Sequence, residues 1–265
     1  MRFTLAPLGD FDIAAIVAAT IALIAYRTRS LDAGGALAAW LVGTACFGAL
    51  GIGGAAVLLA FFLSSVLLSH VARGRKRTAL RDVAKKDARD AAQVLANGAV
   101  AALAALASLQ LEPRYAFAFA GAFAAANADT WGTEIGSLVR RRPRSILTLR
   151  PIATGLSGGV TWAGTVAEIA GALTLATVTT LALDRRAFLA VAIAGIAGAL
   201  VDSILGASLQ SLRWCPYCSR ATEREPHDCG ANTRPVRGLP WLGNDGVNLA
   251  ATATGAAVAY LLAPI

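Results

Sequence analysis

The stretch from Ala124 to Gly136, AAANADTWGTEIG, places two carboxylates and an amide within an otherwise apolar run of the chain. A charged side chain at the centre of a bilayer costs about 3 kcal/mol on insertion scales, so such groups usually face the interior of a helix bundle and serve a site or a pathway. At helical spacing Asn127, Thr130 and Glu134 fall on one stripe, and Asp129 lies beside it. A polar helix end at the membrane interface is the alternative interpretation. The density of oxygen ligands favours a site.

The composition of the whole chain is that of a membrane protein. Of its 265 residues 56% are hydrophobic and 15% are charged, and the mean hydropathy is +0.60. This is too apolar for a soluble domain of this length, and several segments approach the roughly 20 residues that span the hydrocarbon core. The 26 glycines suit helices that pack closely within a bilayer. We therefore expect an all-α, polytopic membrane helix bundle in which residues 1–265 form one integral membrane domain.

About eight apolar segments are predicted to cross the membrane, each as a helix. The first of them could instead be a cleaved signal peptide, but only Arg2 charges the residues before it and further apolar segments follow directly. The predicted spans are 11–26, 34–50, 55–71, 91–109, 115–139, 159–183, 188–212 and 244–262.

The basic residues predict the orientation of this bundle. The formal net charge of +8 would also suit a nucleic-acid-binding protein, but the Lys and Arg side chains stand in short loops between apolar segments. The loops after the first, third, fifth and seventh spans hold 20 of the 24 basic residues. By the positive-inside rule these loops are cytoplasmic, which places both termini outside. We expect the bundle to lie in the inner membrane of the cell. We expect membrane lipids as neighbours and no nucleic-acid partner.

Polar residues from five predicted helices converge on the same membrane face. A chance arrangement would scatter them over both faces, so we infer a single polar cavity that opens to the cytoplasm. The residues of this cavity are Arg89, Gln93 and Asn97, the stretch from Asn127 to Glu134, Ser157, Gly158 and Gly159, Asp202 and Gln210, and Asn244, Asp245 and Asn248.

The predicted cavity combines acidic ligands with cationic groups. Carboxylates and amides supply only hard oxygen ligands, which suit Mg²⁺ bound together with substrate phosphates. Such ligands beside arginines and lysines are typical of phosphoryl or nucleotidyl transfer, where catalysis is largely positioning and charge stabilisation. The predicted catalytic acids are Asp129, Glu134, Asp202 and Asp245, which together with Asn127, Asn244 and Asn248 are the predicted Mg²⁺ ligands; the predicted phosphate-binding residues are Arg89, Gln93, Asn97, Ser157 and Gly158.

One other class of function also uses intramembrane carboxylates, namely a cation or proton pathway. A pathway of this kind does not need the basic rim of the predicted cavity. The chain contains no G-x-x-x-x-G-K-[ST] sequence, which excludes a P-loop nucleotide site.

A polar loop at 213–240 has the residue spacing of a metal site. Three of the four cysteines and one of the two histidines lie in the order Cys215, Cys218, His227 and Cys229. Four such ligands form closed tetrahedral zinc sites that stabilise small loops without a hydrophobic core, so we expect structural rather than catalytic Zn²⁺. A redox pair of the first two cysteines and free thiols are the alternatives. A stable disulfide is disfavoured in the cytoplasm.

Five motifs stand in order between residues 34 and 256. They are RD-x-x-QVLANG at 89–98, ANADTWGTEIG at 126–136, SGGV at 157–160, DS-x-LGA at 202–207 and WLGNDGVN at 241–248. Together they resemble the transmembrane-protein-19-like family of integral membrane proteins, which includes the phytyl-phosphate kinase of plant vitamin E synthesis.

The resemblance implies a membrane kinase that phosphorylates an isoprenoid monophosphate, of the phytyl or prenyl type, to the diphosphate. The phosphoryl donor would be a nucleoside triphosphate, with CTP as one candidate. The isoprenyl tail would stay in the lipid while its phosphate reaches the polar cavity. Two other functions remain open: a membrane nucleotidyltransferase that makes an activated lipid, and an ion-coupled transporter.

Overall fold

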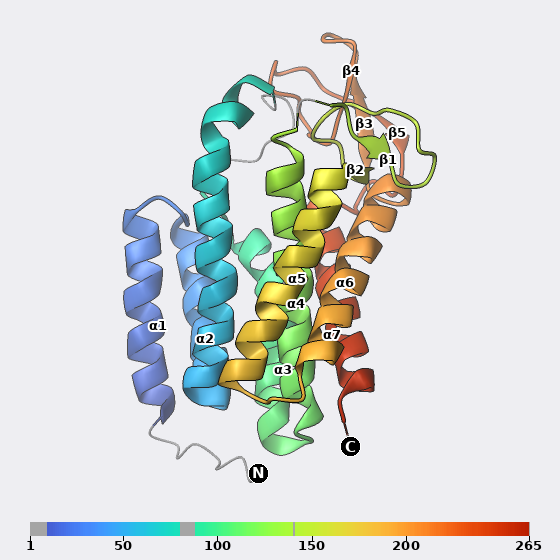
Figure 1. The fold of residues 1–265 in the computed structure, drawn as a ribbon. Helices are drawn as coiled ribbons and strands as arrows, with labels where there is room; N and C mark the ends of the chain where they lie inside the picture. The colour runs from blue at the N-terminus through green and yellow to red at the C-terminus, as the bar shows by residue number, and fades with distance from the viewer. Residues whose placement is uncertain (1–9, 80–87, 140, 265) are drawn as a thin grey trace.

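The protein is a bundle of helices that run side by side, seen in a computed structural model that describes residues 10–79, 88–139 and 141–264 (Figure 1). Short strands lie at one end of the bundle, which we call the strand end. The predicted helical membrane architecture is confirmed, with these strands added. The helices of the described chain are α1 (Asp10–Arg27), α2 (Ala33–Ala79), α3 (Ala91–Gln110), α4 (Arg114–Gly136), α5 (Trp162–Ala182), α6 (Phe188–Ser208) and α7 (Asn244–Leu262), and its strands are β1 (Arg144–Ser145), β2 (Gly159–Val160), β3 (Leu212–Cys215), β4 (Arg220–Thr222) and β5 (Arg234–Arg237).

Helix α2 folds back on itself at Gly51. This residue has φ of 59° and ψ of −149°, a conformation that side-chain-bearing residues rarely adopt, so it interrupts the helix. The segments before and after it lie against each other: a Cβ atom built at Gly43 in the first segment would lie 3.9 Å from a methyl carbon of Leu58 in the second. The two segments cover the second and third predicted spans. The second segment continues beyond residue 71 to Ala79, and the basic residues at 80–87 lie outside the described part of the chain.

By length and composition, four helices of the described chain are able to cross a membrane. They are Ala33–Val71, Ala91–Gln110, Trp162–Ala182 and Phe188–Ser208. The first of these contains the turn at Gly51. The count of eight crossings stays a prediction.

Helix α4 forms the centre of the bundle and packs against α2, α3, α5, α6 and α7. Every residue from Ala116 to Ala128 is buried, and the rings of Phe119 and Phe123 meet edge to face with centroids 5.3 Å apart. Small residues allow the close approach of its neighbours, since a Cβ atom at Gly121 would lie 2.4 Å from the carbonyl oxygen of Gly255. Because α4 faces protein rather than lipid, it can carry acidic side chains in its last turns.

Three predicted helix boundaries change for local reasons. The fifth predicted span ends at Gly136 rather than 139. The sixth begins at Trp162, because the Thr161 hydroxyl accepts a hydrogen bond of 3.0 Å from the Gly164 N–H and caps the helix. The seventh ends at Ser208, because a turn at 209–211 leads into β3, the central strand between β4 and β5. The other small sheet pairs β1 with β2.

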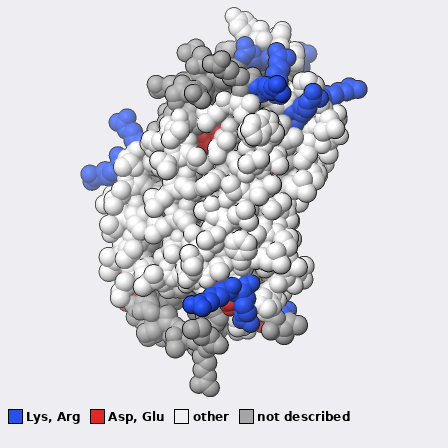
Figure 2. Space-filling model, in the orientation of Figure 1, with Lys and Arg blue, Asp and Glu red and all other residues white. Residues whose placement is uncertain are grey.

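Charged and aromatic side chains mark the strand end of the surface. Figure 2 shows Lys and Arg gathered at this end, a smaller basic group at the opposite end, and a largely uncharged flank between them. Trp162, Trp214 and Trp241 are exposed on elements of the strand end. Tryptophan is enriched where a membrane meets water. Helix α1 begins and α7 ends at the opposite end (Figure 1).

Candidate functional site

Carboxyl groups from three helices meet near the strand end of the bundle. Asp129 of α4 and Asp202 of α6 lie within hydrogen-bonding distance of each other, and the Thr133 hydroxyl also contacts Asp129. Glu168 of α5 interacts electrostatically with both aspartates. We call Asp129, Glu168 and Asp202 the carboxyl centre. Neighbouring carboxylates repel each other when all are ionised, so the three carboxyl groups need a proton or a cation between them.

One oxygen atom of the carboxyl centre lacks a partner. Oδ2 of Asp202 is buried and has no hydrogen-bond partner among the described residues. Buried carboxylate oxygens are normally satisfied, so an unpartnered one indicates an unseen proton, water or ion. The carboxyl centre therefore has the properties of a cation site.

A close helix contact explains how Glu168 reaches the aspartates. A Cβ atom at Gly132 would lie 2.4 Å from Cγ of Glu168, so the glycine leaves the space that this side chain fills. Glu168 was missing from the predicted site. The signal was present, because it is the single acid in the apolar segment from Trp162 to Ala182, and an acid within a span indicates a functional site by default.

Asn127 joins three helices through its amide group. Its Oδ1 accepts a 2.9 Å hydrogen bond from the Ser64 hydroxyl of α2, and its Nδ2 donates at 2.9 Å to the Gly171 carbonyl of α5. The Trp131 indole N–H also donates to the Ser64 hydroxyl, at 3.2 Å. The Asn127 side chain is fully buried. Its contacts thus position α2 and α5 around α4.

Glu134 and Arg89 form a second charged pair beside the carboxyl centre. Oε1 of Glu134 accepts a 2.9 Å hydrogen bond from the Ser69 hydroxyl. Burial lowers the pKa of the Arg89 guanidinium, whereas the nearby Glu134 carboxylate raises it. The guanidinium remains charged, because its ordinary pKa lies far above neutrality. The Arg89 backbone is fixed by hydrogen bonds with Ser30 and Asp32, both at 3.0 Å.

The other two residues of the Arg89 stripe have a local structural role. Asp90 caps α3 by accepting from the Gln93 N–H at 2.9 Å, and Oε1 of Gln93 accepts from the Asp90 N–H at 3.2 Å. This reciprocal pair is a capping box. Nδ2 of Asn97 donates to the Gln93 carbonyl at 2.9 Å. Both side chains also line a groove that ends at Arg89.

The predicted anion-binding turn at Ser157 and Gly158 holds a carboxylate of the same chain. The N–H and hydroxyl of Ser157 donate to Glu223 at 2.8 and 3.1 Å, and Nε2 of Gln210 donates to the same carboxylate at 2.8 Å. Burial raises the pKa of Glu223, whereas the hydrogen bonds from Ser157 lower it. Glu223 also interacts electrostatically with Asp202. The Ser157 and Gln210 donors therefore do bind an anionic group, which is the Glu223 carboxylate of the protein itself.

The residues around Ser157 spell G-x-S-x-G from Gly155 to Gly159, a pattern shared with serine hydrolases. In those enzymes the serine stands on a strand-to-helix turn and faces a histidine. Here the Ser157 hydroxyl contacts Glu223 and Gln210 instead. The pattern is thus a structural turn. Gly158 has φ of 76°, and a Cβ atom there would lie 2.4 Å from the backbone nitrogen of Ala207.

Asn244, Asp245 and Asn248 lie in the first turns of α7, at the strand end. Gly243 is the N-cap of this helix, and Asp245 is an acid in its first turn, where the helix dipole favours negative charge. All three side chains are half-buried. They thus stand at the same end of the bundle as the carboxyl centre.

The Cys and His residues of the 213–240 loop converge as a possible metal site. The ligand atoms of Cys215, Cys218, His227 and Cys229 all lie within 4.8 Å of one another. The four cysteines of the chain are free of disulfides. The turn between β3 and β4 carries the first pair, and the Cys218 N–H donates to Sγ of Cys215 at 3.4 Å.

The distances between these ligand atoms fit a tetrahedral ion. Sγ of Cys215 and Sγ of Cys229 are 3.6 Å apart, and Nδ1 of His227 is 3.6 Å from Sγ of Cys218 and 3.1 Å from Sγ of Cys229. Zinc bonded to sulfur and imidazole nitrogen at its usual distances would separate two sulfurs by about 3.8 Å, and a sulfur from a nitrogen by about 3.5 Å. The four residues could therefore hold a metal ion of this size.

Comparison with known proteins places the chain in a family. The family model described as integral membrane protein DUF92 matches residues 16–256. The chain is 32% identical to Protein PGR of Arabidopsis thaliana over 263 residues, which covers 89% of this chain and 90% of that protein.

Two microbial proteins are also similar. An uncharacterized membrane protein of Methanocaldococcus jannaschii is 30% identical over 72% of this chain and 80% of its own length. Another, from Synechocystis, is 28% identical over 83% of this chain and 78% of its own length. No solved structure matches the chain. The matches confirm the resemblance drawn from the motifs, and the protein belongs to the DUF92 family of integral membrane proteins, which has a plant member in Protein PGR.

Proposed function

We propose that this protein is a membrane kinase that transfers a phosphoryl group from a nucleoside triphosphate, such as CTP, to an isoprenoid monophosphate. The observation that carries the proposal is the carboxyl centre, in which Asp129, Glu168 and Asp202 meet close to the Arg89 and Glu134 pair. Acidic ligands for a metal beside a cation for phosphate are the parts that phosphoryl transfer needs. Membership of a membrane family agrees with a substrate that carries a lipid tail.

The carboxyl centre fits Mg²⁺ by its chemistry. All its donors are hard oxygens, and Oδ2 of Asp202 is buried without a partner among the described residues. We propose that Asp129, Glu168 and Asp202 hold the ion, which when bound neutralises the charge of the phosphates. Asn127 is left out of this set because both ends of its amide are hydrogen-bonded to other helices. Glu134, Asn244, Asp245 and Asn248 remain proposed ligands of the same face.

The proposed reaction requires little general acid or base catalysis by the protein. An oxygen of the isoprenoid monophosphate attacks the γ-phosphorus of the nucleotide, the bond from that phosphorus to the β-γ bridging oxygen breaks, and the nucleoside diphosphate leaves with the bond's electron pair. A phosphate monoester is largely ionised near neutral pH, since its second pKa is about 6, so no general base is needed. Arg89 would hold a phosphate bidentately, and the helices around α4 would exclude water.

We further propose that the strand end faces the cytoplasm, where nucleotides are available, and that Cys215, Cys218, His227 and Cys229 bind structural Zn²⁺. The basic loops supply the argument for orientation. The proposed zinc would fix the loop whose Glu223 reaches Ser157 and interacts with Asp202.

An assay of the purified protein in lipid nanodiscs tests the kinase proposal. The protein is incubated with Mg²⁺, farnesyl or phytyl monophosphate, and a nucleoside triphosphate labelled at the γ-phosphate. We expect labelled isoprenyl diphosphate and unlabelled nucleoside diphosphate. Release of pyrophosphate would instead indicate a nucleotidyltransferase, and ion-driven flux into sealed liposomes without product would indicate a transporter.

The Asp129→Asn variant ties the activity to the carboxyl centre. Removal of this charge should lower turnover by at least about 100-fold, as for other groups that stabilise a charged transition state. Asp12→Asn is the control, because Asp12 is exposed near the start of α1, at the opposite end of the bundle. Near-normal turnover by the Asp129→Asn protein would contradict the assignment.

A further inference from the structure

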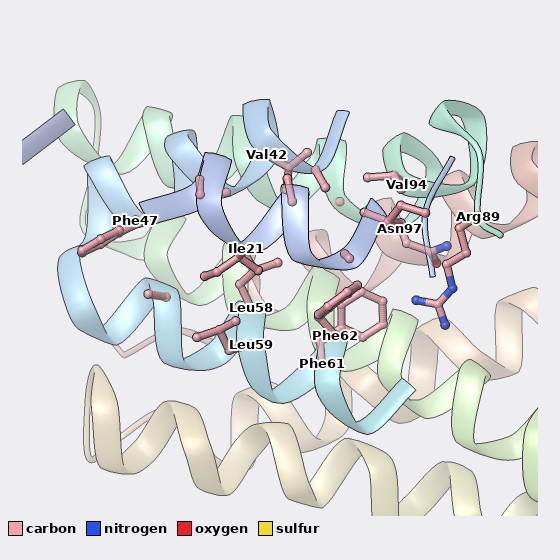
Figure 3. Close-up of a pocket in the computed structure, with 18 of the residues that line it drawn as sticks. Ile21, Val42, Phe47, Leu58, Leu59, Phe61, Phe62, Arg89, Val94 and Asn97 are labelled. Carbon is pink, nitrogen blue, oxygen red and sulfur yellow. The ribbon is translucent and has the colours of Figure 1, made fainter. Parts of the chain in front are cut away.

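A groove with mainly apolar walls runs between α1, the two segments of α2, and α3 (Figure 3). Its cavity volume is about 120 Å³. On α1 its lining extends from Val17 to Ala25, and on α2 from Ala39 to Phe47 and from Ala55 to Phe62. At a rise of 1.5 Å per residue these stretches make the groove about 12 Å long. The groove is therefore long and narrow, a shape that suits a single hydrocarbon chain.

The two ends of the groove differ in polarity. Figure 3 shows Phe47 at one end and Arg89 at the other, with Ile21, Leu58 and Leu59 between them. Among the groove-lining side chains, the polar ones are Arg89, Gln93 and Asn97, and all three come from the residues at the start of α3. A ligand that matches this lining has one apolar chain and one anionic head.

The polar end of the groove lies beside the proposed transfer site. Arg89 interacts electrostatically with Glu134, which stands on the same helix as Asp129. The inner wall is also shared with α4, because Phe123 lines the groove and its ring centroid lies 5.4 Å from that of Phe61. An anionic head on Arg89 would thus approach the carboxyl centre while its chain stays among apolar side chains.

We propose that this groove binds the prenyl tail of the isoprenoid monophosphate, with the tail directed toward Phe47 and the phosphate on Arg89. The proposal rests on the proposed kinase function and adds the place and direction of the lipid substrate. Charge complementarity selects this occupant, because Arg89, the one cationic side chain among the described residues that line the groove, matches a single phosphate head. A diacyl phospholipid has two chains for one narrow groove, and a nucleotide has no apolar chain to fill it.

A substitution at the apolar end tests the direction of the tail. Ala55 lines the groove shortly after the turn at Gly51 and is half-buried. In Ala55→Phe the added ring should exclude the far end of a long tail, so the ratio of kcat/KM for farnesyl over dimethylallyl monophosphate should fall by about tenfold or more. The control is Ala19→Phe, because Ala19 is exposed on α1 and outside the groove lining. We expect this control to leave the ratio unchanged.

Photolabelling tests binding without catalysis. A farnesyl monophosphate analogue with a diazirine at the tail end should label residues 43–59, as mapped by mass spectrometry. Unlabelled farnesyl monophosphate should compete, whereas phosphatidic acid and inorganic phosphate should not. Equal competition by phosphatidic acid would mean that the groove holds a bilayer lipid, and labels that map elsewhere would place the substrate elsewhere. Either result overturns the proposal.

The two proposals fail in different ways. If the wild-type protein phosphorylates no prenyl monophosphate but the probe still labels the groove, the kinase function is wrong and the tail site stands. If the protein is a kinase but Ala55→Phe leaves the substrate ratio unchanged, the tail site is wrong and the kinase function stands.

Discussion

At the scale of single residues, the proposed chemistry rests on the contact of Asp202 with Asp129 and on Oδ2 of Asp202, which has no hydrogen-bond partner in the described part of the chain. Two buried carboxyl groups at this distance are stable when they share a proton or a cation. With a divalent cation bound, both carboxylates can remain ionised and the cation can meet phosphate oxygens. In the proposed metal site Glu168 would add a third negative charge from α5, which would favour a divalent over a monovalent ion.

Substitution of Glu168 tests whether this residue belongs to the metal site. Glu168→Gln keeps the shape and removes the charge, so turnover should fall by about 100-fold and the Mg²⁺ concentration for half-maximal rate should rise. Glu112→Gln is the matched control, because Glu112 is exposed at the opposite end of the bundle. Unchanged Mg²⁺ dependence in Glu168→Gln would mean that this residue packs against Gly132 and does not bind the metal.

Substitution of Arg89 tests phosphate binding at the end of the groove. Arg89→Lys keeps the charge and loses the bidentate fork, so we expect the KM for the isoprenoid monophosphate to rise by about tenfold, with unchanged KM for the nucleotide and unchanged Mg²⁺ dependence. Kinetics with each substrate varied in turn would measure the two KM values separately, and a rise in the KM for the nucleotide alone would contradict the placement of the lipid phosphate on Arg89. If the Mg²⁺ requirement shifts and the KM values do not, Arg89 acts on the metal site or on folding.

Single residues also show how far the sequence can predict a site. Asp129 and Asp202 were predicted to share one face, because each is an acid in an apolar segment, and the structure brings them into contact. The same rule applies to Glu168, which the predicted site lacks; its helix carries no other charged or amide side chain that would form a polar stripe with it. The partner of Gln93 had a signal in the sequence, because an Asp three residues before a Gln at the start of an apolar run is a capping-box pattern. The partner of Ser157 had none, because Glu223 comes from a distant loop.

At the scale of elements, the apolar segments predicted the helices well and the loops poorly. Helix α3 begins at Ala91, its expected start, directly after Asp90 of the capping box that Asp90 and Gln93 form. The hairpin within α2 follows from the glycines around residue 51, which interrupt a long apolar run. The strands β3, β4 and β5 were not expected. They depend on pairing across a loop in which Cys215, Cys218, His227 and Cys229 converge, and tertiary contacts of this kind leave little trace in local sequence.

Metal analysis tests the role of this loop. Protein purified without chelator should contain about one equivalent of zinc, and removal of the zinc should lower the thermal stability of the loop while the helices persist. Circular dichroism and limited proteolysis between residues 213 and 240 would separate these two effects. The Cys215→Ser variant should lose the zinc, whereas Cys46→Ser should retain it, since Cys46 is buried within α2. Zinc-free protein with a protease-resistant loop and full activity would contradict the proposal.

At the scale of the whole molecule, polar and charged groups are separated along the bundle axis. The carboxyl centre, the Cys and His cluster and most of the basic loops lie toward the strand end, whereas α1 begins and α7 ends at the other. Charge counting predicted this separation, because orientation depends on total charge and not on exact contacts. The packing of α4 at the centre could not be predicted, since its alanines and phenylalanines would also suit a lipid-facing helix.

Reporter fusions test the orientation of the bundle. Alkaline phosphatase fused after the C-terminus should be active and green fluorescent protein at the same place should be dark, because the C-terminus is expected outside the cell membrane. Fusions after Leu147, in the loop between α4 and α5, should show the reverse pattern. The same result at both positions would contradict the predicted topology.

The turn at Gly51 also has a consequence for how the chain enters the membrane during synthesis. The two segments of α2 are joined by this one non-helical residue, and a Cβ atom there would meet no other atom within 4 Å. No hydrophilic loop separates the two segments, so no polar linker has to stay in water during insertion and the second segment follows the first directly. We expect residues 33–71 to leave the translocon together, as a preformed hairpin that partitions into lipid in a single step. The ribosome-bound chain should therefore resist extraction from the membrane only after both segments have emerged.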